Sequence, residues 1–338
     1  MKNFTHFYSL TPEWQHELVK KMDGKLINNK IIHIPEALGS GNSFFTQITP
    51  GISALFMDFV LNEPIVINRL QSENELYIFH FDLSQHVNIL KIDNVDYEIG
   101  STDHLSLAVI DNQTESSFKP GVGDRTVALR ILVDKKLLKQ LIKNHPDGEY
   151  GIRKIKAPKK SLYYHDTIDS NSILLIKSIM DKSIFDASFD PYLKGVSLKL
   201  LGNFLNRHEN STTEKNEFSD AEIQAVTKTQ MYLLQNLNNP FPSVPFLSKM
   251  AGMSSSKYKM VFKKRFHDTP NNLFIKEKMI HANKLLRSGD YETLTAIIYE
   301  LNYSKLSYFC SKYYTLFKRK PSQDFIKKTL TKKGSILK

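Results

Sequence analysis

Cysteine is almost absent from this chain of 338 residues, because Cys310 is the only one. A single cysteine excludes a disulfide within the chain and a cysteine-rich metal site. No His-Glu-x-x-His motif is present either, so the sequence predicts no metal. Such sparse use of cysteine fits the reducing cytoplasm.

Long apolar runs are also lacking. No run approaches the roughly 18–20 residues that a membrane-spanning helix requires. Residues Met1–Gly24 alternate polar and apolar side chains and lack the apolar core of a signal peptide. We therefore expect a cytoplasmic protein without a membrane partner.

Catalytic signatures are missing as well. No Gly-x-Ser-x-Gly motif occurs, and no lysine-serine pair follows Gly121 and Gly123, which favours a hairpin turn over a phosphate-binding loop. His80 and His86 could serve a metal site in a barrel, but isolated histidines are more often structural. We therefore expect no catalytic residue, no cofactor and no enzymatic activity.

An aromatic ladder is present twice near the end of the chain, and its two copies lie 51 residues apart (309 − 258). The first copy consists of Tyr258, Phe262, Phe266, Pro270 and Phe274, and the second of Phe309, Tyr313, Phe317, Pro321 and Phe325. A spacing of four residues keeps side chains on one face of a helix. A proline ends that helix and suits the first turn of the next. Each copy therefore predicts a helix, a sharp stop and a new helix with one apolar seam.

The excess of positive charge lies around these ladders. The chain carries 46 basic and 35 acidic residues, a net charge of +11. Residues 218–338 hold 21 basic and 8 acidic residues (21 − 8 = +13), which leaves 25 − 27 = −2 for residues 1–217. A helix with an apolar back and a basic front suits a DNA groove. It could also lie on a membrane, but two aromatic faces bury each other more readily.

Each ladder follows a short helical pattern and a turn. In the first copy, Gly252 suits a left-handed turn, Met253 fills the angle between the helices, and Ser254 can cap the ladder helix. Asn302–Ser304 take these places in the second copy. The pattern predicts two helix-turn-helix units, the second helix of each entering the major groove. A connecting helix over Asn272–Arg287, about 24 Å long, can place them in successive groove turns about 34 Å apart.

These segments resemble the DNA-binding domain of the AraC/XylS family of bacterial transcription regulators. The matching segments, which span roughly a third of the chain, are Leu247–Ser254, Tyr258–Pro270, Ala282–Leu286 and Ile298–Pro321. The family usually has glycine where this chain has His267, Asn302 and Lys318, and arginine where it has Met260 and Ser311. The resemblance implies a cytoplasmic transcription regulator with double-stranded DNA as its partner and RNA polymerase as a further one. Family members often carry an N-terminal, cupin-like barrel that binds a small effector, and they dimerise through nearby helices.

The rest of the chain favours strands. Short alternating runs between Ile31 and Val133, separated by turn-rich breaks, predict an antiparallel barrel or sandwich. Helical patterns follow at Lys135–Asn144, Asp169–Phe185 and Pro191–Arg207. The predicted fold class is α+β, with an all-α C-terminal domain. We expect a β-rich sensor domain over residues 1–165, a helical dimerisation region over 166–208, a linker over 209–219 and a double helix-turn-helix domain over 220–330.

Two sets of residues are predicted to bind ligands. The DNA contacts are expected on the two reading helices and in the basic turn after the second: Ser256, Lys259, Met260, Lys263, Lys264, Lys305, Ser307, Ser311, Lys312, Lys318, Arg319 and Lys320. Effector contacts are expected where polar side chains interrupt apolar strands: Arg69, Tyr77, His80 and Arg130. The alternative for this second set is the solvent face of the sheet.

Three functions fit these patterns. The first is a transcription regulator that responds to a small effector. The second is a DNA-binding protein whose N-terminal domain only dimerises, and the third is a barrel enzyme fused to a DNA-binding module. The charge asymmetry and the paired motifs separate all three from an ordinary enzyme.

Overall fold

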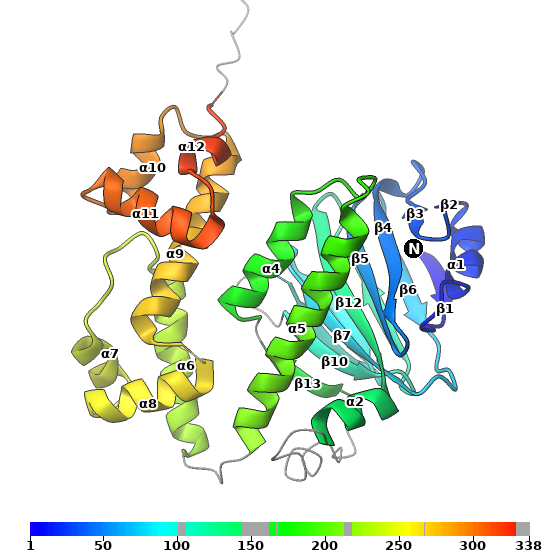
Figure 1. Cartoon of the computed structure of the whole chain (residues 1–338), viewed down its shortest axis with the longest axis horizontal. Coiled ribbons are helices and arrows are strands. Elements are labelled where there is room, and N and C mark those ends of the chain that lie inside the picture. Colours follow the sequence, from blue (N-terminus) through cyan, green and yellow to red (C-terminus); the bar gives the residue numbers. More distant parts are fainter. Residues whose placement is uncertain (101–105, 144–161, 167, 213–217, 267, 329–338) are drawn as a thin grey trace, which may run out of the picture. The chain divides into compact units, whose positions relative to one another are not determined.

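The computed structural model describes residues 1–100, 106–143, 162–166, 168–212, 218–266 and 268–328. The chain divides into two compact units, Met1–Lys215 and Asn216–Lys338 (Figure 1). This division falls within the range expected as a linker, of which residues 213–217 lie outside the described part. His267 and residues 329–330, which the predictions also included, lie outside it as well.

Two β-sheets form the first unit. In spatial order, the five-stranded sheet contains β1 (Lys2–His6), β6 (Ile65–Arg69), β11 (Ser116–Lys119), β8 (Asn88–Ile92) and β9 (Val95–Ile99). The eight-stranded sheet contains β13 (Leu162–Asp166), β10 (Leu107–Asp111), β7 (Leu76–Asp82), β12 (Arg125–Asp134), β5 (Ile52–Leu61), β4 (Gly39–Thr49), β3 (Ile31–His33) and β2 (Lys25–Ile27). The predicted α+β class is confirmed, as two sheets rather than a closed barrel.

The prediction of antiparallel strands holds for every described pair except one, because β1 runs parallel to β6. The strands β1 and β2 and the helix α1 (Trp14–Met22) precede the range that was expected to favour strands. Trp14 and Leu18 of α1 are buried in the core between the two sheets. The N-terminal segment therefore completes this core.

Strand β7 shows how the sequence divides between two cores. Every residue of β7 is buried, as is typical of a strand that is covered on both faces. Leu76 and Ile78 pack between the two sheets. Tyr77 and Phe79 point the other way, into a core shared with the helices. The two-residue alternation of a strand produces this division.

Helices cover the outer face of the eight-stranded sheet. Helix α4 (Ser170–Met180) and helix α5 (Phe189–Thr212) lie across β5, β12 and β7 (Figure 1), and helix α2 (Lys135–Lys143) follows β12 directly. The rings of Phe204 in α5 and Phe79 in β7 meet edge to face, with centroids 4.9 Å apart. All three helices were expected, but α5 continues to Thr212, inside the range expected as a linker.

The second unit is helical in its described part. Its helices are α6 (Asp220–Gln235), α7 (Val244–Met250), α8 (Ser255–Phe266), α9 (Pro270–Ser288), α10 (Leu294–Glu300), α11 (Leu306–Phe317) and α12 (Pro321–Asp324). Prolines open α9 and α12, as the two ladders predict. Tyr258 and Phe262 lie in one small core, and Phe309 and Tyr313 lie in a second. In the described parts of the chain, no helix is long and apolar enough to cross a membrane.

The turns of the two helix-turn-helix motifs are alike but not identical. Gly252 and Asn302 adopt the left-handed conformation, with φ of 65° and 58°, which confirms that Asn302 replaces the expected glycine. Ser254 accepts a hydrogen bond from the backbone N–H of Lys257 at 3.3 Å. The expectation that Ser304 caps α11 is wrong. The helix begins one residue later, after Lys305, whose side chain makes no capping hydrogen bond.

Candidate nucleic-acid interface and N-terminal pocket

Helix α8 has one buried face and one exposed face. Tyr258, Val261 and Phe262 are fully buried. The predicted contacts on this helix, Ser256, Lys259, Met260 and Lys263, are all exposed, and Met260 is 55% exposed. Their spacing of three, four and seven residues places them on one helical stripe. The residues predicted to read DNA on α8 therefore form one continuous surface.

Helix α11 presents the equivalent surface with different chemistry. The 51-residue offset places Ser307 at the position of Ser256 and Ser311 at that of Met260, and both serines are exposed. The offset also places Tyr314, 54% exposed, at the position of Lys263. Tyr314 was missed as a candidate, although the repeat register alone points to it.

Two predicted lysines lie at the edges of these surfaces. Lys264 and Lys312 are half-buried. Their ammonium groups lie over aromatic rings, that of Lys264 at 5.7 Å from the ring centre of Phe218 and that of Lys312 at 5.2 Å from that of Tyr308. Lys305, by contrast, is exposed and flanks the first turn of α11, where the helix dipole attracts anions such as phosphate.

In the basic turn after α11, one of the three predicted DNA contacts also makes an ion pair within the protein. Lys318 is exposed and adopts the left-handed conformation with φ of 57°, and Lys320 is exposed. Arg319, which was predicted to contact DNA, also pairs within the turn itself. Its Nε lies 2.7 Å from a carboxylate oxygen of Asp324, which is buried. The loss of a buried carboxylate's partner is costly, so Arg319 stabilises the turn.

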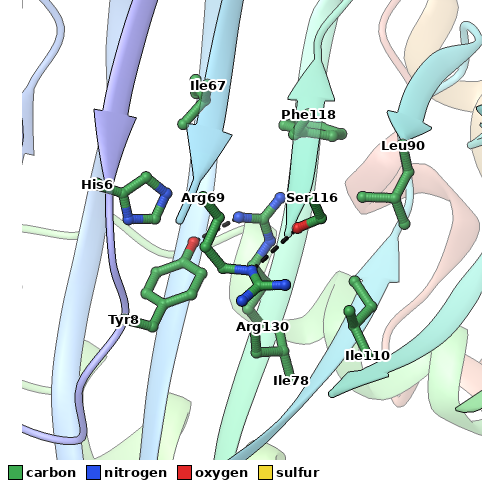
Figure 2. A pocket seen from close by; sticks show the side chains of 10 residues that line it. All are labelled: His6, Tyr8, Ile67, Arg69, Ile78, Leu90, Ile110, Ser116, Phe118 and Arg130. Atoms are coloured by element: carbon green, nitrogen blue, oxygen red, sulfur yellow. Dashed lines mark hydrogen bonds between the residues drawn. The ribbon is translucent and has the colours of Figure 1, made fainter. Parts of the chain in front are cut away.

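A pocket opens between the two sheets of the first unit (Figure 2). Its lining consists of His6, Tyr8, Ile67, Arg69, Ile78, Leu90, Ile110, Ser116, Phe118 and Arg130. The enclosed space is small, with room for about one water molecule. Of the four predicted effector contacts, the structure brings Arg69 and Arg130 together here.

Arg69 is held by a complete set of oxygen acceptors. Its Nε donates to the hydroxyl of Ser116 at 3.0 Å, and its Nη1 donates to the backbone and side-chain oxygens of Asn112 at 2.8 and 2.9 Å. Its Nη2 donates to the backbone carbonyls of Asp111 and Thr114. Burial lowers the pKa of Arg69 to about 10, which leaves the guanidinium charged at neutral pH.

His80 is completely buried behind Arg130 rather than in the pocket lining. Its Nδ1 accepts a hydrogen bond from Arg130 Nε at 2.8 Å, and its Nε2 lies 3.4 Å from a carboxylate oxygen of Asp82. Burial, together with the charge of Arg130, lowers the pKa of His80. A neutral imidazole whose Nδ1 accepts must carry its proton on Nε2. His80 therefore positions Arg130.

Tyr77, which was also predicted to contact the effector, does not line this pocket. Tyr77 precedes Ile78 on β7, so it points to the opposite face of the sheet, into the core beneath the helices. Its ring lies 5.3 Å from the ammonium group of Lys135. The pocket residues that were missed include His6 and Tyr8, which belong to β1 and the segment after it. The alternation of Lys2–His6 was the available signal.

Comparison with known families bears on the second unit. Residues 247–325 match the family described as "Helix-turn-helix domain". This segment is a helix-turn-helix domain of the AraC type. The AraC-type domain includes α8, the connecting helix α9 and α11, so it contains both exposed surfaces described above.

Solved structures show weaker likenesses. ToxT from Vibrio cholerae is 16% identical, over 81% of this chain and 97% of that chain, with a TM-score of 0.32. Its unsaturated fatty acid-bound form is 14% identical, over 81% and 95%, with a TM-score of 0.32. A probable AraC family transcriptional regulator from Rhodopseudomonas palustris is 26% identical, over 30% and 94%, with a TM-score of 0.28. These scores are too low to support a functional argument, and no curated protein matches the chain.

Proposed function

We propose that the protein is a sequence-specific DNA-binding transcription regulator that reads DNA with helices α8 and α11. The observation that carries this proposal is the repeated arrangement of these helices. Each buries an aromatic seam and exposes the opposite stripe, within one AraC-type domain. Helix α9 joins the two helix-turn-helix motifs with 19 residues, or about 28 Å. This length suits groove turns about 34 Å apart.

The two surfaces suit different parts of DNA recognition. Lysines on α8 and in the basic turn can neutralise phosphates, which supplies affinity that depends on salt. The exposed methyl end of Met260 suits the methyl group of thymine, and serines can bond to any base edge. Without the arginines that commonly read guanine, we expect this protein to rely on lysine, serine and methyl contacts and on DNA shape.

The N-terminal unit is proposed to bind a small effector in its pocket. Polar groups that converge in an apolar pocket are the usual form of a ligand site. Arg69 and Arg130 supply them here, against walls of isoleucine, leucine and phenylalanine. We place the protein in the cytoplasm, with RNA polymerase as a further partner of the DNA-bound form.

We also propose that two copies pair through the exposed face of α5. Tyr192 is 49% and Leu198 is 45% exposed on this face. Gly195 lies between these two residues, and Gly202 follows Leu198. Both glycines face open space, so a partner helix could approach closely. Light scattering of the full chain should give a dimer, and Leu198→Glu should shift it to the monomer. Val95→Glu, at a similarly exposed apolar site on β9, is the matched control.

The decisive experiment compares two lysines of α8 in gel-shift assays. Lys259 is exposed on the proposed reading stripe, whereas Lys257 pairs with Glu222 of α6. Lys259→Ala should weaken operator binding at least about fivefold, and Lys257→Ala should change it less than twofold. Both variants remove one positive charge from the same helix. Equal effects of the two would show that only net charge matters and would contradict reading by this face.

A fragment experiment tests the assignment of DNA binding to one unit. Residues 218–338 should bind duplex DNA, and residues 1–210 should not. The reason is that residues 218–338 carry a net charge of +13, whereas residues 1–217 carry one of −2. DNA binding confined to residues 1–210 would overturn the proposal.

A further inference from the structure

We propose that Lys278 holds the two helix-turn-helix motifs in one relative orientation, and that this orientation sets the spacing between the two DNA segments that the protein reads. This inference rests on the proposed function, because it concerns how α8 and α11 reach DNA together. It is carried by three observations: the place of Lys278 between two separate cores, its contacts to both motifs, and the cost of burying an ammonium group without a carboxylate partner.

Lys278 lies in the middle of α9, between the two small hydrophobic cores of the second unit. Phe274, one turn before it, belongs to the core of the first motif, and Ala282, one turn after it, belongs to the core of the second. Helix α9 runs from one motif to the other (Figure 1). Because the described residues form two cores here, apolar packing holds each motif together internally. The orientation of one motif against the other therefore depends on the contacts made at this junction.

The ammonium group of Lys278 contacts both motifs at once. Its Nζ donates a hydrogen bond to the backbone carbonyl of Asn239 at 2.6 Å, in the segment between α6 and α7. The same Nζ lies 5.3 Å from the ring centre of Phe274 and 5.1 Å from that of Tyr303. Aromatic rings attract a cation at such distances. Since Tyr303 occupies the turn between α10 and α11, one charged atom joins the first motif to the turn that directs α11.

A second contact attaches the same segment to α9. The Nε2 atom of His281 lies 3.1 Å from the side-chain oxygen of Asn238. An amide oxygen only accepts, so the histidine donates this bond. His281 does not reach the turn of the second motif by any described hydrogen bond or ring contact. Loss of the Lys278 ammonium group would therefore leave the first motif attached to α9 and would release its link to the second.

Burial of this ammonium group is costly, which argues against a role in stability alone. Lys278 is 3% exposed, and no described carboxylate pairs with it. Burial lowers the pKa of Lys278 to about 8, which leaves it mostly charged at neutral pH. Replacing buried charges by apolar side chains of similar volume is often neutral or stabilising. An ammonium group does, however, require acceptors in defined directions, and this requirement specifies one arrangement of its neighbours.

The orientation of the motifs matters because DNA is itself a helix. Each added base pair shifts the groove by about 3.4 Å and rotates it by about 35°. Two reading helices that are held rigidly can enter the major groove together at one spacing of their base contacts. If the motifs could turn about α9, several spacings would bind with similar affinity. A fixed junction therefore provides discrimination between spacings.

The first experiment measures the orientation without DNA. Nitroxide labels are attached to Ser256→Cys in α8 and Ser307→Cys in α11 of the full chain, with Cys310→Ser, which removes the only cysteine. Both serines are exposed and occupy equivalent positions of the repeat. Pulsed electron paramagnetic resonance should give one narrow distribution of distances. Lys278→Met keeps the apolar stem and removes the ammonium group, and it should widen the distribution at least about twofold.

A lysine on the same helix supplies the matched control. Lys276 pairs with Asp268 at 2.7 Å, close to the start of α9, so Lys276→Met removes one charge from α9 without changing the junction. It should leave the distribution as in the unaltered protein. Tyr303→Leu removes the ring on the second motif and should widen the distribution, which provides a test if Lys278→Met does not fold. Unchanged widths in Lys278→Met and Tyr303→Leu, or equal widening by Lys276→Met, would overturn the proposal.

The second experiment measures discrimination between spacings. The full chain selects its operator from random duplexes, and one base pair is then added or removed between the segments that α8 and α11 contact. The unaltered protein and Lys276→Met should bind the altered operators at least about tenfold more weakly. For Lys278→Met the same change should cost less than about threefold. A purely structural role of Lys278 would weaken binding to all these operators alike, and such an unchanged ratio would overturn the proposal.

The two experiments together separate this inference from the proposed function. A distribution that widens in Lys278→Met, although the unaltered protein selects no DNA sequence, would support the orienting role of Lys278 and refute the proposed regulator. DNA binding that depends on Lys259, with unchanged widths and an unchanged spacing ratio in Lys278→Met, would refute only the role of Lys278.

Discussion

Replacing Tyr313 by phenylalanine removes one hydroxyl from a buried polar cluster at the back of α11. This hydroxyl donates a hydrogen bond to a carboxylate oxygen of Asp324 at 2.6 Å and accepts one from Asn283 Nδ2 at 2.6 Å. Asn283 and Asp324 are each 5% exposed. Arg319 pairs with the same carboxylate oxygen. The cluster therefore joins α9, α11, the basic turn and α12.

The magnitude follows from the kinds of bond that are lost. A hydrogen bond to a charged group contributes about 1.5–3 kcal/mol, and a buried donor left without a partner costs about 1–3 kcal/mol. Because Asn283 also contacts Asp324 at 3.4 Å, its donor is only partly stranded. We expect Tyr313→Phe to lower the free energy of unfolding of the second unit by about 2–4 kcal/mol.

The first ladder supplies a matched control. The hydroxyl of Tyr258 lies 3.0 Å from that of Thr229, and both side chains are fully buried. This bond joins two neutral groups, so Tyr258→Phe should cost only about 0.5–1.5 kcal/mol. Scanning calorimetry of the full chain, with hydrogen exchange to identify the unit that unfolds, measures both variants. An equal loss, or a larger loss for Tyr258→Phe, would refute the assignment of a charged cluster to the second helix-turn-helix alone.

Three further predictions concern single residues or pairs. Lys259→Ala should weaken one operator position by about 1–3 kcal/mol in competition assays with single-base variants; an equal loss on every sequence would make it a phosphate contact. Joint replacement of Lys318 and Lys320 by alanine should flatten the slope of log affinity against log salt by roughly 2 units. Arg319→Ala, by contrast, should lower the melting temperature of the second unit. A calorimetric scan that the variant leaves unchanged would disprove this role of Arg319. The pKa of His6 is lowered by burial from 6.5 to about 3, so its contribution to stability is complete above pH 6.5 and is lost as the pH falls toward 3, by about 2 kcal/mol at pH 5. His6→Phe should therefore flatten the decline of the melting temperature between pH 6.5 and 4, and an unchanged decline would rule out this role.

The helical repeat could be predicted because its signals are local. A spacing of four residues, a proline and a left-handed turn residue each act within a few positions along the chain. The stops at Gly252, Pro270, Asn302 and Pro321 therefore appear where expected. The two helical cores follow as well, since an aromatic seam at helical spacing has to be buried somewhere.

The unforeseen placements of Arg319 and Tyr77 depend on partners in other elements. Arg319 was predicted to contact DNA, and its structural role in the turn became visible only with the carboxylate of Asp324 beside it. Tyr77 and Ile78 are neighbours in an equally apolar strand, and only the positions of the second sheet and of α5 decide which of them faces the pocket side. When both faces of a strand are covered, the local pattern does not say which face points to the other sheet and which to the helices.

The sequence by itself determined the two helix-turn-helix motifs, their connector and the basic character of the C-terminal third, because periodicity and charge are properties of the chain. Only the tertiary structure decided which polar residues meet inside the N-terminal unit. Arg69 and Arg130 lie on strands of different sheets, and Tyr8 follows a strand that pairs in parallel with β6. Their convergence on one pocket results from the packing of two sheets, which brings together residues far apart along the chain.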